Sequence, residues 1–315
     1  MKIADVFIYL NHYSIIFSNN LIRKLRIDSL FRFLNRNLAF VILSIYYKFL
    51  SDKRKNSLHS IKKKKAPVYI SLTTYPPRIT TLWLTLETLL HQTVLPDKII
   101  VYLSRKQFSD ESKLPKILLK QQKRGIDFVF VDEDYKSHKK YYYLLKYCAD
   151  KPFITVDDDL LYDSKLVERL IHSHKTYSNE VICSYGYTMN YQDNGLCQSY
   201  NSWKLNSEKK SASFDTFFGS GGGTLFPVGC FYTDVLDHEI FTRLTPTADD
   251  VWLNAMVRLN NVKIRQISVL SILNIPTTKR ITLSKDNVGL NKNDEQINAV
   301  MNFYGKSIFS DQTNF

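Results

Sequence analysis

From residue 66 onward, short apolar runs rich in β-branched residues alternate with longer stretches whose apolar positions have helical spacing. The runs expected to form strands are VYISLTTY (68–75), KIIVYLS (98–104), IDFVFVD (126–132) and FITV (153–156). The stretches expected to form helices between them are TTLWLTLETLLHQ (80–92), residues 115–124 and residues 138–148. Strands that alternate with helices predict an α/β fold, with a mostly parallel sheet covered by helices on both faces.

The order of elements is less regular after residue 156. The expected elements are a helix near residues 164–175, a strand VICSYGYT (181–188), a glycine-rich segment GSGGGTLFP (219–227), a helix TADDVWLNAMVRLN (247–260) and a strand VKIRQISVL (262–270), followed by a polar tail. A chain of 315 residues is long enough to bury one large core. We therefore predict one folded domain over residues 66–315, preceded by an extension over residues 1–65.

The extension differs from the domain in charge and in pattern. Residues 1–65 contain 14 Lys and Arg against three Asp, which accounts for +11 of the formal net charge of +13. Because the domain itself is nearly neutral, we expect no nucleic-acid partner for it. The longest apolar run of the extension, residues 38–47, is well short of the roughly 20 residues that cross a bilayer.

Two arrangements are open for this extension. A basic amphipathic segment with aromatic residues suits an anionic membrane surface, where each Lys or Arg contributes about 1 kcal/mol of attraction. The alternative is a helical extension that packs on the domain and ends in a solvated lysine linker. No signal-peptide pattern follows the first residue, and the four cysteines form no C-x-x-C pair. We expect a cytoplasmic protein, peripheral on the inner face of the membrane.

Three adjacent carboxylates, Asp157 to Asp159, directly follow the predicted buried strand FITV. Side chains alternate along a strand, so Asp157 and Asp159 are expected on one face and Asp158 on the other, unless the strand has already broken into a turn. Two carboxylates on one face suit Mg²⁺ or Mn²⁺, which complete their shells with water and substrate phosphates. Such an ion would offset the cost of burying the carboxylates. A solvated acidic turn is the alternative.

Further polar residues follow other predicted strands, and ligands of parallel sheets bind at that edge. Thr73 and Tyr75 end the first strand, and Asp132 ends the third. Arg78 and Lys140 each have two interpretations. Either side chain would counter the charge of a bound diphosphate, or it belongs to a solvated surface.

The segment GSGGG does not match the known phosphate-binding loops. It lacks the Lys-Ser/Thr of a Walker A motif, and it follows the acidic triplet instead of opening the first helix as a dinucleotide-binding loop does. Gly221, Gly222 and Gly223 would let the backbone approach a bulky ligand closely. A structural turn is the other interpretation.

Asp249 and Asp250 open a predicted helix. Acidic residues in the first helical turn are favoured by capping and by the helix dipole, which contribute about 0.3 to 1 kcal/mol. One of the two could equally serve as a general base. Their spacing does not choose between these roles.

Taken in order, ISLTTYPPRI, DYKSHKKYY, ITVDDDLLY, GSGGGTLFP and ADDVWLNAM resemble the motifs of a bacterial family 2-type glycosyltransferase with the Rossmann-like GT-A fold. The resemblance covers roughly residues 67–305 and is strongest to the capsule and O-antigen polysaccharide branch. That branch carries an Asp-Tyr-Gly-Pro-x-x-Lys element before the acidic strand. Asp134, Tyr135 and Lys140 match this element, whereas Lys136 and Ser137 stand in place of Gly-Pro.

The resemblance implies a nucleotide-diphosphate-sugar donor and a bound Mn²⁺ or Mg²⁺. The residues implied for the donor are Thr73, Tyr75 and Arg78 at the nucleotide, Asp157 with Asp158 near the ribose, Lys140 at the diphosphate, and Gly221, Gly222 and Gly223 around the sugar and acceptor. Asp159, with Asp157, would hold the metal. Asp249 takes the place of Glu in the family's Glu-Asp pair, which makes Asp250 the implied base.

A second departure from the family lies after the second strand. YLS (102–104) stands where many members have an acidic pair, so Asp132 or Asp134 would take over a ribose or base contact.

The implied function is inverting, metal-dependent transfer of a sugar to a hydroxyl group of a saccharide acceptor, lipid-linked, in surface polysaccharide biosynthesis. Two alternative functions are open. A metal-dependent nucleotidyl- or phosphotransferase would need a phosphate loop, or a phosphorylatable Asp followed by a Thr/Ser cluster, and the sequence contains neither. A non-catalytic membrane-surface binding protein would rely on the +11 extension alone.

Overall fold

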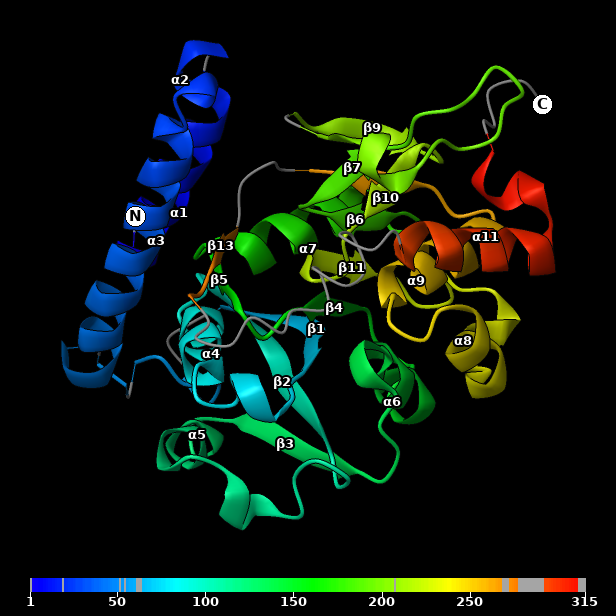
Figure 1. Cartoon of the computed structure of the whole chain (residues 1–315). Helices are drawn as coiled ribbons and strands as arrows, with labels where there is room; N and C mark the ends of the chain where they lie inside the picture. The colour runs from blue at the N-terminus through cyan, green and yellow to red at the C-terminus, as the bar shows by residue number, and fades with distance from the viewer. Residues whose placement is uncertain are drawn as a thin grey trace.

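The computed structural model describes residues 2–18, 20–50, 52–53, 55–60, 64–206, 208–267, 272–276 and 292–310. An eight-stranded sheet forms the centre of the molecule (Figure 1), in the order β3–β2–β1–β4–β11–β6–β12–β9. Its strands are β1 (Lys64–Thr73), β2 (Val94–Ser104), β3 (Ile126–Val131), β4 (Phe153–Val156), β6 (Val181–Cys183), β9 (Lys210–Ser213), β11 (Gly222–Phe226) and β12 (Ile264–Gln266).

Most of this sheet is parallel. Strand β1 pairs in parallel with β2 and β4, β2 with β3, and β6 with β12. Strand β11 runs antiparallel between β4 and β6, and β9 is antiparallel to β12 at the edge. The prediction of an α/β fold with a mostly parallel sheet is confirmed.

Helices cover both faces of the sheet. One layer contains α4 (Leu82–Leu90), α5 (Lys116–Gln122) and α7 (Leu166–Thr176), and the other contains α6 (Lys139–Tyr147), α8 (His238–Leu244), α9 (Asp249–Leu259) and α11 (Lys292–Tyr304). Alternation along β1 divides the core accordingly. Ile70 and Leu72 pack in the cluster of α4 and α7, whereas Tyr69 packs in the cluster of α6 and α9.

Two small sheets flank the large one. Strand β5 (Leu160–Tyr162) pairs antiparallel with β13 (Ile272–Asn274), and β7 (Gly186–Thr188) lies between β10 (Thr216–Phe218) and β8 (Lys204–Leu205). The short 3₁₀ turns are Pro76–Arg78, Glu111–Lys113, Lys136–His138, Tyr200–Ser202, Thr233–Leu236 and Lys306–Phe309.

Two predicted elements differ from the structure. The single strand expected over residues 181–188 is divided into β6 and β7, which belong to different sheets. The segment expected as a polar tail contains α11, whose Ile297, Val300 and Met301 are buried at helical spacing. Of the strand expected over residues 262–270, β12 occupies the middle, and residues 268–270 lie outside the described part of the chain.

The N-terminal extension is helical and packs on the domain. It consists of α1 (Ile3–Ile16), α2 (Asn20–Lys24), α3 (Ile27–Ile45) and a π-helical turn, Tyr46–Leu50. The Asp5 carboxylate accepts hydrogen bonds from the backbone N and the Oγ of Ser164, at 2.7 and 2.8 Å. Asn35 Nδ2 of α3 donates to the Phe7 carbonyl of α1 at 2.9 Å. The Asp5 contacts fix the extension to the domain, and the Asn35 contact holds α3 against α1 within the extension.

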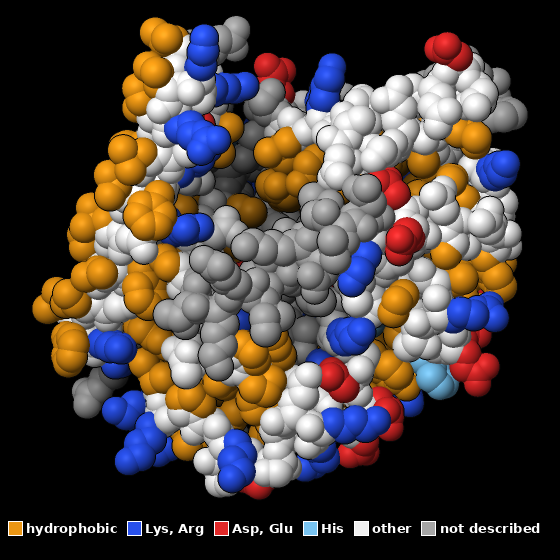
Figure 2. All heavy atoms as spheres, viewed as in Figure 1, with side chains coloured by type: hydrophobic (Ala, Val, Ile, Leu, Met, Phe, Trp, Pro, Cys, Tyr) orange, Lys and Arg blue, Asp and Glu red, His pale blue; other side chains and the backbone are white. Residues whose placement is uncertain are grey.

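Helix α3 buries two polar residues and leaves many of its large apolar residues exposed. Its buried residues are Asp28, Asn35, Ala39 and Leu43. The exposed ones are Ile27, Leu30, Phe31, Phe33, Leu34, Leu38, Val41 and Ile45, whose exposed fractions range from 42% to 59%. Figure 2 shows this apolar band along the left edge of the molecule, with Lys and Arg side chains beside it. None of the helices within the described residues is long and apolar enough to cross a membrane.

Candidate functional site

A cavity of about 450 Å³ opens where β1 and β4 end, a size typical of ligand sites. Its lining includes most of the residues predicted from the sequence: Thr73, Tyr75, Arg78, Lys140, Asp157, Asp158, Asp159, Gly221, Gly222 and Asp250. Thr73 Oγ1 is held by the Tyr102 carbonyl of β2 at 2.8 Å. The Arg78 guanidinium lies over the Tyr75 ring, 5.4 Å from its centre.

The acidic triplet is a turn and not the continuation of a strand. Strand β4 ends at Val156, so of the two expected arrangements the turn is the one found, and all three aspartates line the cavity. The Tyr162 hydroxyl holds the turn, because it accepts the backbone N–H of Asp157 at 2.7 Å and donates to the Gly221 carbonyl at 2.5 Å. A tyrosine that follows the triplet in the sequence thus ties it to the glycine segment.

Arg78 offsets the negative charge of two of these carboxylates. Its Nη1 lies 2.6 Å from Asp158 Oδ1 and its Nη2 lies 2.9 Å from Asp159 Oδ2. Thr74 Oγ1 donates to the other Asp158 oxygen at 2.5 Å. Burial nevertheless raises the pKa of Asp158, and it raises the pKa of Asp159 to about 7, because desolvation outweighs the attraction of the guanidinium.

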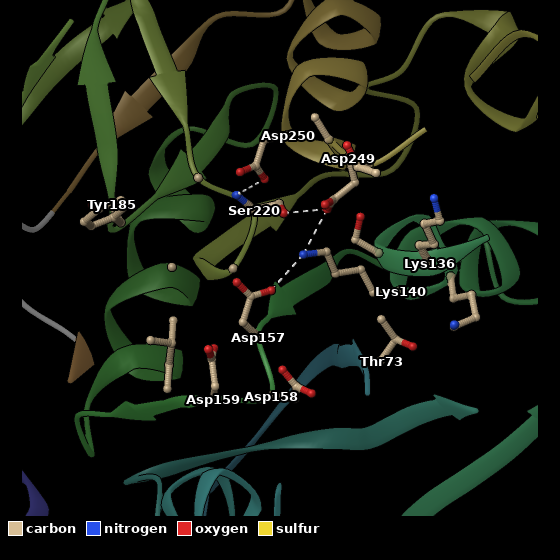
Figure 3. A pocket seen from close by; sticks show the side chains of 18 of the residues that line it. Thr73, Lys136, Lys140, Asp157, Asp158, Asp159, Tyr185, Ser220, Asp249 and Asp250 are labelled. Atoms are coloured by element: carbon tan, nitrogen blue, oxygen red, sulfur yellow. Dashed lines mark hydrogen bonds and ion pairs between the residues drawn. The ribbon is translucent and has the colours of Figure 1, made fainter. Parts of the chain in front are cut away.

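Lys140 connects the acidic turn to the start of α9. Its Nζ lies 2.9 Å from both Asp157 Oδ1 and Asp249 Oδ2 (Figure 3). Burial alone would lower the pKa of Lys140, but the two carboxylates raise it, so the side chain stays charged although it is only 3% exposed. The Ser71 hydroxyl of β1 donates to the Lys140 carbonyl and fixes this turn of α6.

Asp249 and Asp250 are neighbours with different electrostatics. The Ser220 hydroxyl donates to Asp249 Oδ2 and the Ser220 backbone N–H donates to Asp250 Oδ1, both at 2.7 Å. Burial opposes ionisation of Asp249, yet Lys140 and the other partners lower its pKa. Burial, followed by the charge of Asp249, raises the pKa of Asp250 to about 7. The N-cap residue of α9 is Ala248, and no side chain caps the helix. Asp249 and Asp250 lie in its first turn and do not act as caps.

Two glycines of the GSGGG segment are explained by what lies against them. A Cβ on Gly221 would be 1.8 Å from Asp157 Oδ2, and a Cβ on Gly222 would be 2.4 Å from the Tyr185 Cβ. Gly223 was also predicted to face the ligand, and this prediction is wrong. Its φ is +91°, and a Cβ there would meet Leu166 of α7 at 2.8 Å, outside the cavity lining. Gly223 therefore has a packing role.

The structure does not bring Asp132 into the site. Its side chain is 90% exposed and lies 3.4 Å from Arg105 Nε, outside the cavity lining. Strand β3, which Asp132 follows, is at the edge of the sheet, with β2 and β1 between it and β4. The prediction of a ribose or base contact by Asp132 is therefore wrong.

Several lining residues were not predicted. They include Gln107, Lys136, Lys139, Tyr185, Tyr187, Tyr200 and Ser220. Lys136, which stands where the resembled motif has glycine, has a left-handed backbone with φ of +50°. This conformation costs a non-glycine residue about 1 kcal/mol or more. The lysine in a glycine position was the feature of the sequence that could have drawn attention to this residue. Lys139, beside the predicted Lys140, forms a buried ion pair with Asp134.

Two carboxylates of the acidic turn are candidate ligands for a hard divalent cation. Within the described ranges no group of three or more His, Cys, Asp or Glu side chains is arranged to hold a metal. Asp157 and Asp159 both reach the cavity, with 43% and 17% of their side chains exposed. Mg²⁺ and Mn²⁺ bind through one or two protein carboxylates together with substrate phosphates, which is the donor set that this turn offers.

No protein-family model matches the sequence, and no curated protein matches it either. Among solved structures, S. aureus TarS residues 1–349 is 14% identical, with 65% of this chain and 60% of that one covered and a TM-score of 0.45. Its complex with UDP-GlcNAc is also 14% identical, with 65% of this chain and 58% of that one covered and a TM-score of 0.42. HddC from Yersinia pseudotuberculosis is 13% identical over 75% of this chain and 99% of that one, with a TM-score of 0.38. Likeness at this level does not identify the reaction.

Proposed function

We propose that the chain is a glycosyltransferase that moves a sugar from a nucleotide-diphosphate-sugar donor to a hydroxyl of a saccharide acceptor. The observation that carries the proposal is the bridge made by Lys140, which brings the acidic turn after β4 and the acidic pair of α9 to one cavity. Both groups contain a carboxyl whose pKa is raised to about 7, but Asp159 has the Arg78 guanidinium beside it, whereas Asp250 has no salt bridge among the described residues. The acidic turn would serve the donor, and the acidic pair of α9 would serve the acceptor.

The donor side is formed by residues after β1 and β4. Thr73, Tyr75 and Arg78 would contact the nucleotide, and Asp157 with Asp159 would hold Mn²⁺ or Mg²⁺. Such an ion, when bound, would neutralise charge that develops on the diphosphate leaving group. Arg78 and Lys140 already lie on the carboxylates of this side, so they are placed to contribute positive charge to the same diphosphate.

The acceptor side is formed by the start of α9. Asp250 would accept the proton of the attacking hydroxyl, since its raised pKa makes it a better base at neutral pH than an ordinary aspartate. Asp249 stays ionised beside Lys140 and raises the basicity of Asp250. Attack on the anomeric carbon from the side opposite the diphosphate would invert its configuration.

A thermal-shift screen tests this proposal. The full chain is heated with a panel of nucleotide-diphosphate sugars, each with and without Mn²⁺, because a ligand that binds only the folded state raises the melting temperature. We expect one donor class to stabilise the protein, and more so with the metal. Stabilisation by nucleoside triphosphates alone would instead favour a nucleotidyl- or phosphotransferase.

We further propose that the extension places the cavity beside a lipid-linked acceptor at the inner face of the cytoplasmic membrane. The outward apolar face of α3 supports this proposal, together with the basic residues of the extension, among them Arg23, Lys24, Arg32 and Lys53. Apolar area and attraction to anionic lipid act together in helices that lie in a membrane surface. Packing on the domain through Asp5 leaves this face free to bind lipid.

Vesicle co-sedimentation tests the membrane proposal without deleting helices that contact the domain. Wild-type protein should sediment with phosphatidylglycerol-containing vesicles and much less with pure phosphatidylcholine. Leu38→Glu in the apolar band should reduce binding severalfold, whereas Val228→Glu, at an equally exposed site outside the extension, should not. Equal binding by both variants and the wild type would remove the proposed role of α3.

A further inference from the structure

Tyrosine rings form one wall of the cavity. Tyr185 precedes β7, Tyr187 lies on β7, and Tyr200 opens the 3₁₀ turn Tyr200–Ser202, with the buried Phe217 next to it. The ring centres of Tyr185 and Tyr187 are 5.6 Å apart, as are those of Tyr187 and Tyr200. The Tyr185 and Tyr187 hydroxyls lie 3.0 Å from each other. All three tyrosines are half-buried, so the wall is fixed by packing and still accessible from the cavity.

The glycine segment is shaped around this wall. A Cβ on Gly222 would lie 2.4 Å from the Tyr185 Cβ, and one on Gly219 would lie 3.0 Å from the Tyr185 ring. Any side chain at Gly222 would therefore displace Tyr185. The glycines leave space for the ring directly beside the backbone that holds Asp250 through Ser220.

The wall belongs to the Asp250 side of the cavity. Burial raises the pKa of Tyr185, Tyr187 and Tyr200, and the charge of Asp250 raises it further in each case. Figure 3 shows Tyr185 on the opposite side of the acidic residues from Thr73 and Lys136. Among the described residues that line the cavity, those between 185 and 222 include no charged side chain.

We infer that this tyrosine wall is the acceptor subsite and that it takes an uncharged pyranose ring; the inference rests on the proposed glycosyl transfer. A pyranose has C–H faces that pack on the electron-rich faces of aromatic rings, and hydroxyls around its edge that bond to tyrosine hydroxyls. Stacked on the wall, such a ring presents a hydroxyl towards Asp250. A phosphate or carboxylate on the ring would face Asp249 and Asp250 with no basic residue from the wall to offset it.

A glycan array probed with the full chain tests the subsite without any donor. The array carries neutral hexose-terminated oligosaccharides, and counterparts whose terminal ring is a uronic acid or a 6-phosphate. Neutral termini should be retained about tenfold better than the charged ones, because Asp249 and Asp250 repel a negatively charged ring. Tyr187→Ala should lower retention about tenfold, as loss of a ring contact does, and Tyr187→Phe should lower it less.

Tyr147→Ala is the matched control, since Tyr147 is an exposed tyrosine outside the cavity, and it should bind like the wild type. Should an alanine variant fail to fold, Tyr185→Phe and Tyr187→Phe, which keep the rings, still report on the hydroxyls. The inference is overturned when the wild type retains no neutral glycan, when it retains charged termini equally well, or when folded wall variants all bind like the wild type.

The thermal shift caused by the donor tests the proposed function independently of the glycan array. Wall variants should keep the melting-temperature shift caused by the nucleotide-diphosphate sugar, because the donor is expected on the side of Arg78 and Asp159. A positive array with no stabilisation by any donor would contradict glycosyl transfer and leave a saccharide-binding wall. Donor stabilisation with a negative array would retain the transferase and remove the tyrosine subsite.

Discussion

The cavity contains two groups of adjacent aspartates, and the groups differ in the cations that lie beside them. In the turn after β4, Asp158 and Asp159 share the Arg78 guanidinium, and Asp157 has the Lys140 ammonium. At the start of α9, Asp249 shares Lys140, whereas the hydrogen bond to Asp250 comes from the neutral backbone of Ser220. The first group is therefore paired with cations throughout, and the second contains one carboxylate without a salt bridge among the described residues.

This contrast indicates a division of chemical roles. Carboxylates held by cations can exchange those partners for a divalent ion and a diphosphate, since the total charge of the site stays balanced. Asp159 and Asp250 both have a pKa raised to about 7, but Arg78 holds Asp159, whereas Asp250 has no salt bridge among the described residues and can accept a proton. The acidic turn after β4 would thus bind the metal and the diphosphate, and the acidic pair of α9 would take part in proton transfer. Four changes to the chain or the medium would break or sharpen this distinction.

Replacing the proposed base should have the largest effect. Asp250→Asn keeps the side chain's shape and removes its ability to accept a proton, so transfer should fall by roughly 10² to 10⁴-fold. Donor binding, measured as a thermal shift, should stay close to that of the wild type. Asp237→Asn is the control, because Asp237 caps α8 outside the cavity through its bond to Ile240 N and should affect stability only. Lost donor binding with normal residual turnover would contradict the assignment of Asp250.

Removing the shared cation should be the next largest change. Lys140→Met leaves Asp249 buried without its partner and should lower the free energy of unfolding by about 3 to 5 kcal/mol, as for other broken buried pairs. Donor binding should weaken as well. Lys151→Met breaks the similar 2.8 Å pair with Asp97 at the surface and should change stability much less. Equal melting temperatures for the two variants would show that the Lys140 bridge is not needed to hold the two groups together.

The pH profile tests the raised pKa of Asp250. A carboxyl with a pKa of about 7 is protonated at pH 6 and ionised at pH 8, so acceptor kcat/KM at saturating donor should rise through pH 7. On the acid side the rate should fall about tenfold per pH unit, as for one essential ionised base. Asp249, Lys140 and Asp157 are the charged groups that act on Asp250, and the first two keep their charge across this range. A flat profile between pH 5.5 and 8 would exclude Asp250 as the base.

The smallest effect is expected outside the cavity. Asp132→Asn alters an exposed carboxylate at the edge of the sheet and should change transfer by less than about twofold, as is usual for surface substitutions. Steady-state kinetics with donor and acceptor varied separately would measure it. A large increase in the KM for the donor would restore the ribose contact that the sequence suggested for Asp132.

The sequence predicted the strands and helices well where periodicity was strong. It also located the acidic turn, because three aspartates after a buried strand stand out from their apolar neighbours. The turn's shape was not predictable, since it depends on Tyr162 reaching Gly221, 59 residues further along the chain. Asp132 was wrongly assigned because periodicity gives the ends of strands and not the order of strands within a sheet. Strand order separated Asp132 from β4.

The tyrosine wall was missed for a related physical reason. Residues 181–188 have the composition of one continuous strand, and this pattern does not place Tyr185 and Tyr187 at the cavity. The chain instead leaves the large sheet after β6, and Ser184 bonds to the Gly222 carbonyl at 2.6 Å at this point. That break turns the tyrosines towards the cavity. In α11, by contrast, the apolar spacing of Ile297, Val300 and Met301 was present in the sequence and was overlooked in a polar context.

Anomalous diffraction at the manganese edge tests the central claim most directly. Crystals of the full chain would be soaked with Mn²⁺ and the nucleoside diphosphate of the donor that gives the largest thermal shift. We expect one manganese peak bound to Asp159 or Asp157, with the diphosphate on the same ion and Asp250 across the cavity. Diphosphate density without manganese at that turn, or a manganese peak elsewhere, would contradict it.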